Sequence, residues 1–205
     1  MNTARSAHGT LLTSWTAGTE MSAATRVAAV LLITVATAAA AQISVPLGVT
    51  PVPLVMQDMV VLLGGAALGS RLGMAAQVLY LLAGISGLPV FAASPVLPQG
   101  PLRILGPTGG YLLSYPFAAF LTGYLAERGF DRRYSTSVLA MAAGLVVIFA
   151  FGVPWLAWFA RPAVGFNAAL HAGLYPFLLG DVFKIFLGAA ILPGIWKLIG
   201  RSADR

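Results

Sequence analysis

Six long apolar runs, separated by short segments that carry most of the charges, constrain this chain more than any other feature of its sequence. Apolar residues make up 59% and charged residues 9% of the 205 positions, whereas a soluble domain is about 25% charged. About 20 consecutive apolar residues cross a bilayer as a helix. We therefore predict an all-α membrane protein, with a membrane domain at 23–200 and six transmembrane helices at about 27–45, 53–69, 72–88, 108–125, 137–155 and 174–196.

The basic residues are distributed unevenly among the connections between these runs. Nine of the twelve lie in the N-terminal segment, in every second connection and in the C-terminal tail, and two lie in the other connections. Because Lys and Arg stay preferentially on the cytoplasmic side, we predict a protein of the cytoplasmic (inner) membrane with both termini inside. The nine are Arg5, Arg26, Arg71, Arg128, Arg132, Arg133, Lys197, Arg201 and Arg205, and the two are Arg103 and Arg161.

The two ends of the chain are predicted to lie outside the membrane domain. Residues 1–22 are small and polar, which predicts a flexible tail, and residues 201–205 are predicted to form a short cytoplasmic tail. The first apolar run has an alternative interpretation as a cleaved signal peptide, because the four alanines at 38–41 would suit a small-residue cleavage site.

The connections predicted to lie outside are rich in proline. Residues 46–53 contain three prolines, and residues 89–107 are long, apolar and rich in proline and glycine. Proline removes a backbone donor and restricts the residue before it, so these segments cannot be helical throughout. Irregular backbone near the membrane is tolerated where it is buried or lines a cavity. We therefore expect ordered outer loops that roof a ligand pocket.

Asp181 and Lys184 are the most informative residues, because both lie in the middle of the last apolar run. An Asp or Lys at the centre of a membrane helix costs about 2.5–3.5 kcal/mol. Residues three apart share one face of a helix. The pair is either a packing ion pair or part of a ligand site, in which Lys184 donates to a ligand oxygen and Asp181 accepts from ligand N–H groups.

Two further segments have the chemistry of a ligand site. Gln57 and Asp58 lie at the start of the second run, where they either solvate the helix end or, for Gln57, both donate to and accept from a ligand. The fourth run begins with the turn Gly106-Pro107-Thr108-Gly109-Gly110-Tyr111, which would present backbone N–H groups and a tyrosine hydroxyl.

Several classes of chemistry are absent from the sequence. The chain has no cysteine, which excludes disulfides, thiolate catalysis and cysteine-ligated metals, and we predict no metal site or resident cofactor. Its two lysines are not in a Gly-Lys-Ser/Thr context, so it has no P-loop for ATP. The charges do not form a basic patch interleaved with aromatic residues, which argues against nucleic acid as a partner.

An enzymatic alternative rests on Gly84-Ile85-Ser86-Gly87, which matches the short serine motif of rhomboid intramembrane proteases. His171 would be its base, and the two side chains would have to meet within hydrogen-bond reach. This hypothesis leaves Asp181 and Lys184 unexplained, and we therefore predict that the chain is not an enzyme.

Small residues recur at the spacing that allows helices to pack closely. Gly65, Gly69 and Gly73 are spaced by four, which predicts packing inside the protein. Ala24 and Ala28, near the cytoplasmic end of the first run, could instead dock another membrane subunit.

Four blocks of the sequence, taken in order, resemble the BioY family, the biotin-binding S components of energy-coupling factor (ECF) transporters. The resemblance covers about 42–197 and does not cover the first 22 residues. It rests on Pro51-Val52-Pro53 with Gln57, on Gly87-Leu88-Pro89-Val90-Phe91, on Gly106–Tyr111, and on Pro176-Phe177-Leu178-Leu179-Gly180-Asp181 with Lys184.

This resemblance implies a membrane subunit that captures biotin from the outer side with high affinity. The family's aspartate and lysine fall on Asp181 and Lys184, and its small-residue contact with a transmembrane T component falls on Ala24 and Ala28. Two partner ATPases would supply the energy, in agreement with the missing P-loop. Further ligand contacts are expected from Gln57, Tyr111, Phe91, Thr108 and Arg103.

Three questions stay open at this stage. The sequence does not decide which end of biotin Lys184 contacts, whether the chain forms homo-oligomers within the lipid membrane, or whether it transports without the ATPase subunits. The alternative function is an S component or secondary transporter for another small vitamin.

Overall fold

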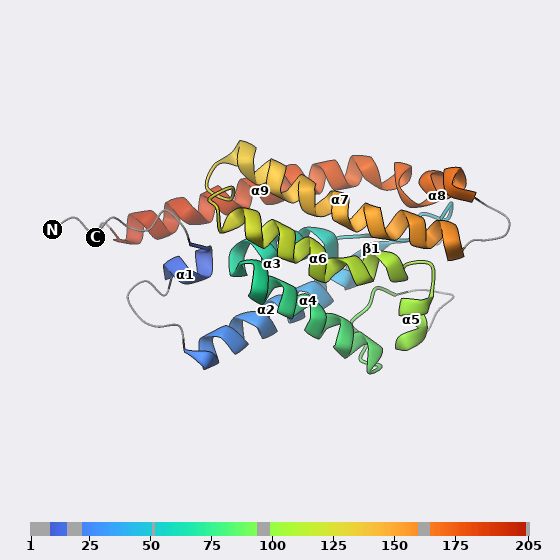
Figure 1. The fold of residues 1–205 in the computed structure, drawn as a ribbon, viewed down its shortest axis with the longest axis horizontal. Coiled ribbons are helices and arrows are strands. Elements are labelled where there is room, and N and C mark those ends of the chain that lie inside the picture. The colour runs from blue at the N-terminus through green and yellow to red at the C-terminus, as the bar shows by residue number, and fades with distance from the viewer. Residues whose placement is uncertain (1–8, 16–21, 51, 94–98, 160–164, 204–205) are drawn as a thin grey trace.

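The computed structural model describes residues 9–15, 22–50, 52–93, 99–159 and 165–203, which are mostly helical. The long helices run side by side along the long axis of the molecule (Figure 1). The helices of this part of the chain are α1 (Leu11–Trp15), α2 (Ala23–Gln42), α3 (Gln57–Leu68), α4 (Ser70–Ile85), α5 (Pro101–Leu105), α6 (Gly109–Ala126), α7 (Tyr134–Phe159), α8 (Gly165–Gly173) and α9 (Tyr175–Ala203), and its strands are β1 (Ser44–Val45) and β2 (Leu54–Val55).

A helix lies over each of the six apolar runs that the sequence predicts, namely α2, α3, α4, α6, α7 and α9. Within the described residues, three segments are long and apolar enough to cross a membrane: Ala23–Gln42, Tyr134–Trp158 and Tyr175–Lys197. Helices α3 and α4 are apolar but shorter. The prediction of a helical membrane protein is therefore confirmed, whereas the number of crossings stays a prediction.

A two-stranded hairpin replaces parts of the first two predicted runs. Strands β1 and β2 pair antiparallel, with Ser44 opposite Val55 and Val45 opposite Leu54. The predicted runs 27–45 and 53–69 were therefore too long at the ends that face this hairpin. The reason is the prolines at 46 and 53, because proline cannot donate a helical hydrogen bond and disfavours helix in the residue before it.

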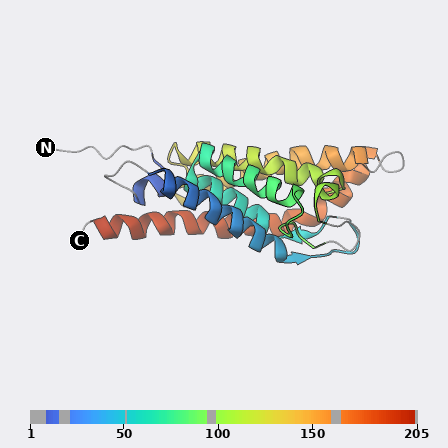
Figure 2. The ribbon, with the colours of Figure 1, turned by 90° about the horizontal axis from the view of Figure 1, so that it is seen from below.

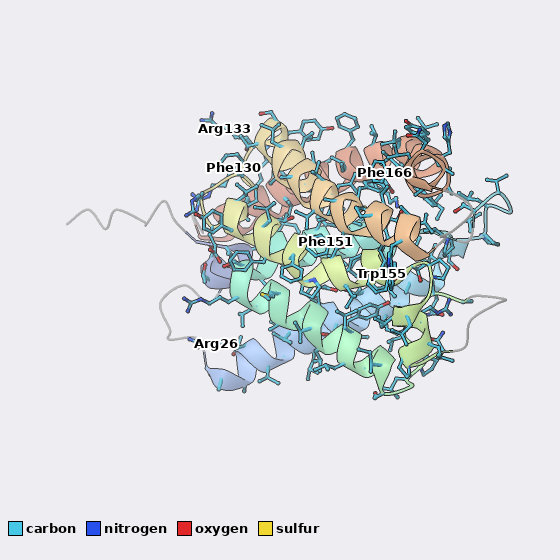
Figure 3. All side chains as sticks on the ribbon, turned by 45° about the vertical axis from the view of Figure 1, so that its right-hand side comes forward. Arg26, Phe130, Arg133, Phe151, Trp155 and Phe166 are labelled. Atoms are coloured by element: carbon cyan, nitrogen blue, oxygen red, sulfur yellow. The ribbon has the colours of Figure 1, made fainter. Side chains whose placement is uncertain are left out.

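The two ends of the bundle differ in character. The hairpin, α5 and α8 lie at one end, and α1 lies near the C-terminal end of α9 at the other (Figures 1 and 2). Arg26 and Arg133 lie at the end with α1, whereas Trp155 and Phe166 lie at the end with the hairpin (Figure 3). Arg26 and Arg133 therefore lie at the opposite end of the bundle from the hairpin.

Part of the segment that the sequence predicts to be a flexible tail is structured. Residues 11–15 form α1, which packs against α3 and α9. Leu11 is buried in a small apolar cluster with Ala66, Ala126 and Leu192. This short helix therefore packs on the bundle through the buried Leu11 side chain, although the surrounding segment is polar. Most of the remaining tail residues lie outside the described part of the chain.

Glycines bring α3, α4 and α6 unusually close together. A Cβ atom at Gly65 would collide with the carbonyl oxygen of Ala119 on α6, and one at Gly73 would lie 2.7 Å from the Cα of Gly65. Gly69 has a φ of 88°, which allows the sharp turn between α3 and α4. The glycines spaced by four therefore serve packing within the chain.

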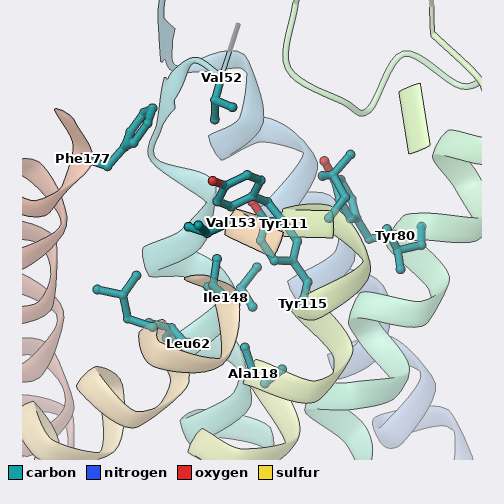
Figure 4. Packing of buried hydrophobic residues seen from close by; sticks show 14 of the residues in the cluster. Val52, Leu62, Tyr80, Tyr111, Tyr115, Ala118, Ile148, Val153 and Phe177 are labelled. Atoms are coloured by element: carbon teal, nitrogen blue, oxygen red, sulfur yellow. The ribbon is translucent and has the colours of Figure 1, made fainter. Parts of the chain in front are cut away.

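The main apolar core lies among α3, α4, α6, α7 and α9 and includes several aromatic side chains (Figure 4). Tyr80 and Tyr115 are fully buried, with tilted rings whose centroids are 6.4 Å apart. A buried tyrosine needs a partner for its hydroxyl group. The core of this bundle therefore contains a polar layer, which leads directly to the candidate site.

We expect Gly65→Ala to lower the thermal stability of the purified protein in detergent. The added methyl group collides with backbone at Ala119, and overpacking of this kind costs about 1–3 kcal/mol. Gly194→Ala is the matched control, because it is also helical and a Cβ there has no neighbour within 4 Å. Thermal unfolding of both variants would measure the difference, and an unchanged melting temperature for Gly65→Ala would contradict the proposed close contact.

Candidate ligand-binding cavity

A cavity lies at the end of the bundle that carries the hairpin. Its walls are mostly aromatic and aliphatic, with a small set of polar and charged groups, which is the usual character of a small-molecule site. The residues that line it are Val52, Pro53, Val55, Gln57, Asp58, Phe91, Ala92, Arg103, Thr108, Tyr111, Leu112, Tyr115, Ile148, Phe149, Phe177 and Asp181.

Three charged side chains meet at the floor of this cavity. Lys184 Nζ lies 3.2 Å from Asp58 Oδ2 and 2.5 Å from Asp181 Oδ1. The ammonium also donates a hydrogen bond of 2.8 Å to the carbonyl oxygen of Val55 on strand β2. Asp181 and Asp58 face the cavity, whereas Lys184 is not part of its wall. The lysine therefore pairs with the two carboxylates on the side that faces away from this cavity.

A chain of hydrogen bonds continues from Asp58 through the core. Tyr115 donates to Asp58 Oδ1 over 2.8 Å, and Gln57 Nε2 donates to the Tyr115 hydroxyl. The Tyr80 hydroxyl lies 3.2 Å from both Gln57 Oε1 and the Val90 carbonyl oxygen, so its one proton is shared between these two acceptors. This chain links the charged floor to the segment that follows α4. It also uses much of the hydrogen-bonding capacity of Gln57 within the protein itself.

Three buried polar atoms from cavity-lining residues have no hydrogen-bond partner in the described structure. They are Oδ1 of Asp181, Nε of Arg103 and Oγ1 of Thr108. Oδ1 of Asp181 is nevertheless paired with the Lys184 ammonium group, so the groups that lack any partner are those of Arg103 and Thr108. A buried polar group without a partner costs about 1–3 kcal/mol. These groups are therefore the natural contacts for a polar ligand.

Arg103 lies on the short helix α5, in one of the proline-rich connections, and is only 5% exposed. Burial lowers the pKa of its guanidinium group from the ordinary value, because removal from water disfavours the charged form. An arginine in this position suits a planar anionic group such as a carboxylate.

The apolar walls of the cavity come from two sides. Phe91 packs edge-on against Tyr80, with ring centroids 5.5 Å apart, and a Cβ at Gly84 would collide with the Phe91 ring. Tyr111 packs edge-on against Phe149, and its hydroxyl donates to the Gly173 carbonyl oxygen over 2.8 Å. The Tyr111 ring is therefore fixed beside the cavity, while its hydroxyl proton is already engaged with α8.

The structure brings six of the seven ligand residues expected from the sequence to one cavity, and places the seventh, Lys184, directly beneath it. It also brings to the cavity three residues that are not among the ligand contacts expected from the sequence: Asp58, Tyr115 and Phe177. Helical spacing could have found two of them. Tyr115 follows Tyr111 by four residues, Phe177 precedes Asp181 by four, and residues four apart share a face.

Ala24 and Ala28 lie on α2, at the opposite end of the bundle, and both are exposed. They take no part in the cavity.

The serine-protease hypothesis finds no support in the geometry. The Ser86 hydroxyl donates to the carbonyl oxygen of Ala83 in its own helix, over 2.7 Å. The ring of His171 packs edge-on against Tyr175, with centroids 4.9 Å apart. Each side chain is therefore engaged with another neighbour.

A helical membrane bundle with a mostly apolar cavity and a few buried polar groups defines a small-molecule-binding membrane protein. The family model described as "BioY family" matches residues 10–201, and the chain therefore belongs to the BioY family. The match also begins well before residue 42, where the resemblance of the sequence blocks begins. The prediction of family membership is confirmed.

Relatives of the chain are named as transporters. A probable biotin transporter BioY from Pyrococcus horikoshii is 42% identical over 161 residues, covering 78% of this chain and 90% of the relative. The biotin transporter BioY of Thermotoga maritima is 36% identical over 158 residues, covering 77% and 88%. Membership of a transporter family also confirms the prediction that the chain is not an enzyme.

A solved structure has a similar fold. The crystal structure described as the S-component for biotin from an ECF-type ABC transporter matches with a TM-score of 0.74 and 24% sequence identity. The match covers 87% of this chain and 95% of that chain. It shows that the fold of this chain is that of an S component.

Proposed function

We propose that this protein is the biotin-capturing subunit of a biotin transporter, which binds the vitamin with high affinity at the outer side of the membrane for uptake. The observation that carries the proposal is the cavity whose buried floor holds Asp181, paired with Lys184. Membership of the BioY family and relatives named as biotin transporters support biotin as the ligand.

The chemistry of biotin fits the groups around the cavity. Biotin has a ureido group with two N–H donors and one carbonyl acceptor, an apolar fused ring and a carboxylate tail. Asp181 can accept from a ureido N–H, and Thr108 can donate to the ureido carbonyl. Arg103 suits the carboxylate tail, and Phe91 and Tyr111 can cover the fused ring. Since Lys184 lies behind Asp181, we infer that it acts on the ligand through that carboxylate.

We expect purified wild-type protein to bind labelled biotin and Asp181→Asn to bind it at least about tenfold more weakly. The substitution removes a charge-assisted hydrogen bond worth about 1.5–3 kcal/mol. Asp131→Asn is the matched control, because Asp131 is fully buried but accepts from Trp196, outside the cavity.

The same equilibrium measurement tests the alternative ligands. Competition by thiamine or riboflavin, without competition by biotin, would favour a transporter for another vitamin. Unchanged biotin affinity in Asp181→Asn would instead remove Asp181 from the site while keeping biotin as the ligand.

We propose six crossings of the cytoplasmic membrane, with both termini inside and with the hairpin, residues 86–93 and α5 forming the outer roof. The separation of Arg26 and Arg133 from the end with Trp155 and Phe166 supports this orientation (Figure 3). The basic end would face the cytoplasm by the positive-inside rule.

Single cysteines can test this orientation, because the chain has none of its own. We expect a membrane-impermeant maleimide to label Leu88→Cys in intact cells. Ser22→Cys and Ser135→Cys should react after the membrane is opened. All three positions are exposed in the structure. Labelling of Ser22→Cys in intact cells would contradict an internal N-terminus.

We propose that the exposed face of α2 with Ala24 and Ala28 docks the T component of an ECF transporter, whose two ATPase subunits supply the energy. Ala28 helps to line an apolar groove together with residues of α1, α3 and α9. Small residues at this spacing let a partner helix approach closely. The chain's own lack of a P-loop agrees with energy from separate subunits. A second copy of the chain on this face is the competing occupant.

We expect Ala28→Trp to reduce co-purification with the T component and biotin uptake by cells, with little change in biotin binding. The large side chain would block the groove, which lies far from the cavity. Ala150→Trp is the matched control, because Ala150 is also exposed but lies on α7. If Ala28→Trp instead changed the chain's own oligomeric state and left uptake intact, the groove would be an interface between copies.

A further inference from the structure

The floor of the cavity contains more negative than positive charge. Asp58 and Asp181 are two carboxylates that share one ammonium group, that of Lys184. Lys184 is only 5% and Asp181 only 3% exposed. Charges removed from water to this extent must be paired. The proposed function assigns a role in ligand binding to Asp181 alone. The second carboxylate of this cluster, that of Asp58, therefore needs an explanation of its own.

Asp58 uses both of its oxygens as acceptors, toward two different elements. Oδ2 accepts from Lys184 on α9, and Oδ1 accepts from Tyr115 on α6. An ionised carboxylate only accepts, whereas an asparagine must present an NH₂ group on one side. The neutral variant Asp58→Asn would therefore either lose the bond to the lysine or turn its NH₂ group toward Tyr115, which would have to accept where it now donates. This is not the role of an acid that merely solvates the start of a helix.

The bond to Tyr115 also sets the direction of every hydrogen bond that follows. Because Asp58 only accepts, Tyr115 must donate to it and so accepts from the amide nitrogen of Gln57. The amide oxygen of Gln57 then faces Tyr80, which donates to it. Asp58 thereby fixes which atoms of Gln57 and Tyr115 remain able to meet a ligand.

We propose that Asp58 is a positioning residue of the biotin site: it holds Lys184 beneath the cavity, so that Asp181 accepts from the ligand, and it fixes the polarity of the Tyr115–Gln57–Tyr80 chain. Lys184 supports this assignment, since it already donates to Val55 and contacts both carboxylates. The inference rests on the proposed function, because biotin is the ligand whose affinity reports it.

A charge-compensation cycle tests the proposal by equilibrium binding of labelled biotin. We expect Asp58→Asn to weaken binding at least about tenfold, and Lys184→Met, which leaves two carboxylates without a cation, at least about a hundredfold. The double variant Asp58→Asn/Lys184→Met has one carboxylate and no lysine, and so keeps the wild-type net charge. It should bind biotin at least about tenfold more tightly than Lys184→Met alone.

Other roles of these residues give different outcomes. If Lys184 contacts biotin directly, removal of Asp58 cannot rescue Lys184→Met, and the double variant will bind no better than the single one. If Asp58 only stabilises the start of α3, Asp58→Asn will change affinity less than about fivefold. Either result would overturn the proposal. Tyr115→Phe should weaken binding non-additively with Asp58→Asn, because both break the same chain.

Two controls separate this inference from the proposed function and from general destabilisation. Glu127→Gln removes a carboxylate that accepts from Ser70 N and Oγ at the other end of the bundle, and it should leave biotin affinity unchanged. If wild type fails to bind biotin, the proposed function is wrong. The melting temperatures of the ligand-free variants then test Asp58 on their own: the double variant should melt above Lys184→Met.

Discussion

The ion cluster of Lys184, Asp58 and Asp181 is the interaction on which the rest of this structure depends. Charged groups in an apolar bundle are tolerated only when they are paired and hydrogen-bonded. Here the pairing draws together α3 and α9 and, through the carbonyl oxygen of Val55, strand β2. The position of the hairpin relative to the last helix is therefore set by the need to satisfy one buried ammonium group.

The same requirement extends into the aromatic core. Asp58 needs a second donor, which Tyr115 supplies, and the tyrosine in turn needs Gln57 and Tyr80. The close contact of α3 and α6 at Gly65 and Ala119 lies on the same pair of helices that this chain joins. Small residues thus bring the helices together, and the polar layer fixes how they align. Interiors packed in this way transmit a change at one residue to its neighbours.

The cavity exists because the outer ends of the helices do not continue. Prolines convert the ends of two apolar runs into a hairpin, and further prolines and glycines give the irregular segment around α5. These segments contribute Val52, Pro53 and Arg103 to the cavity wall. Irregular backbone is therefore placed where it lines a cavity, which is the setting in which a membrane protein tolerates it. The family relatives named as biotin transporters give this cavity its proposed ligand.

The sequence by itself determined that the chain is a helical membrane protein, roughly where its six main helices lie and where most of its basic residues are placed, because these follow from local hydropathy, proline chemistry and the spacing of Lys and Arg. It also identified Asp181 and Lys184, since charges in an apolar run are conspicuous. Only the tertiary structure decided that Lys184 lies behind the carboxylates, that Asp58 shares it, and that Tyr115 and Phe177 reach the cavity. The contacts of Asp58 join residues that are far apart in the sequence. Tyr115 follows Asp58 by 57 positions, and Lys184 follows it by 126 positions. No local pattern encodes the relative rotation of two packed helices, which is fixed by the glycine contacts and by the pairing of buried charge.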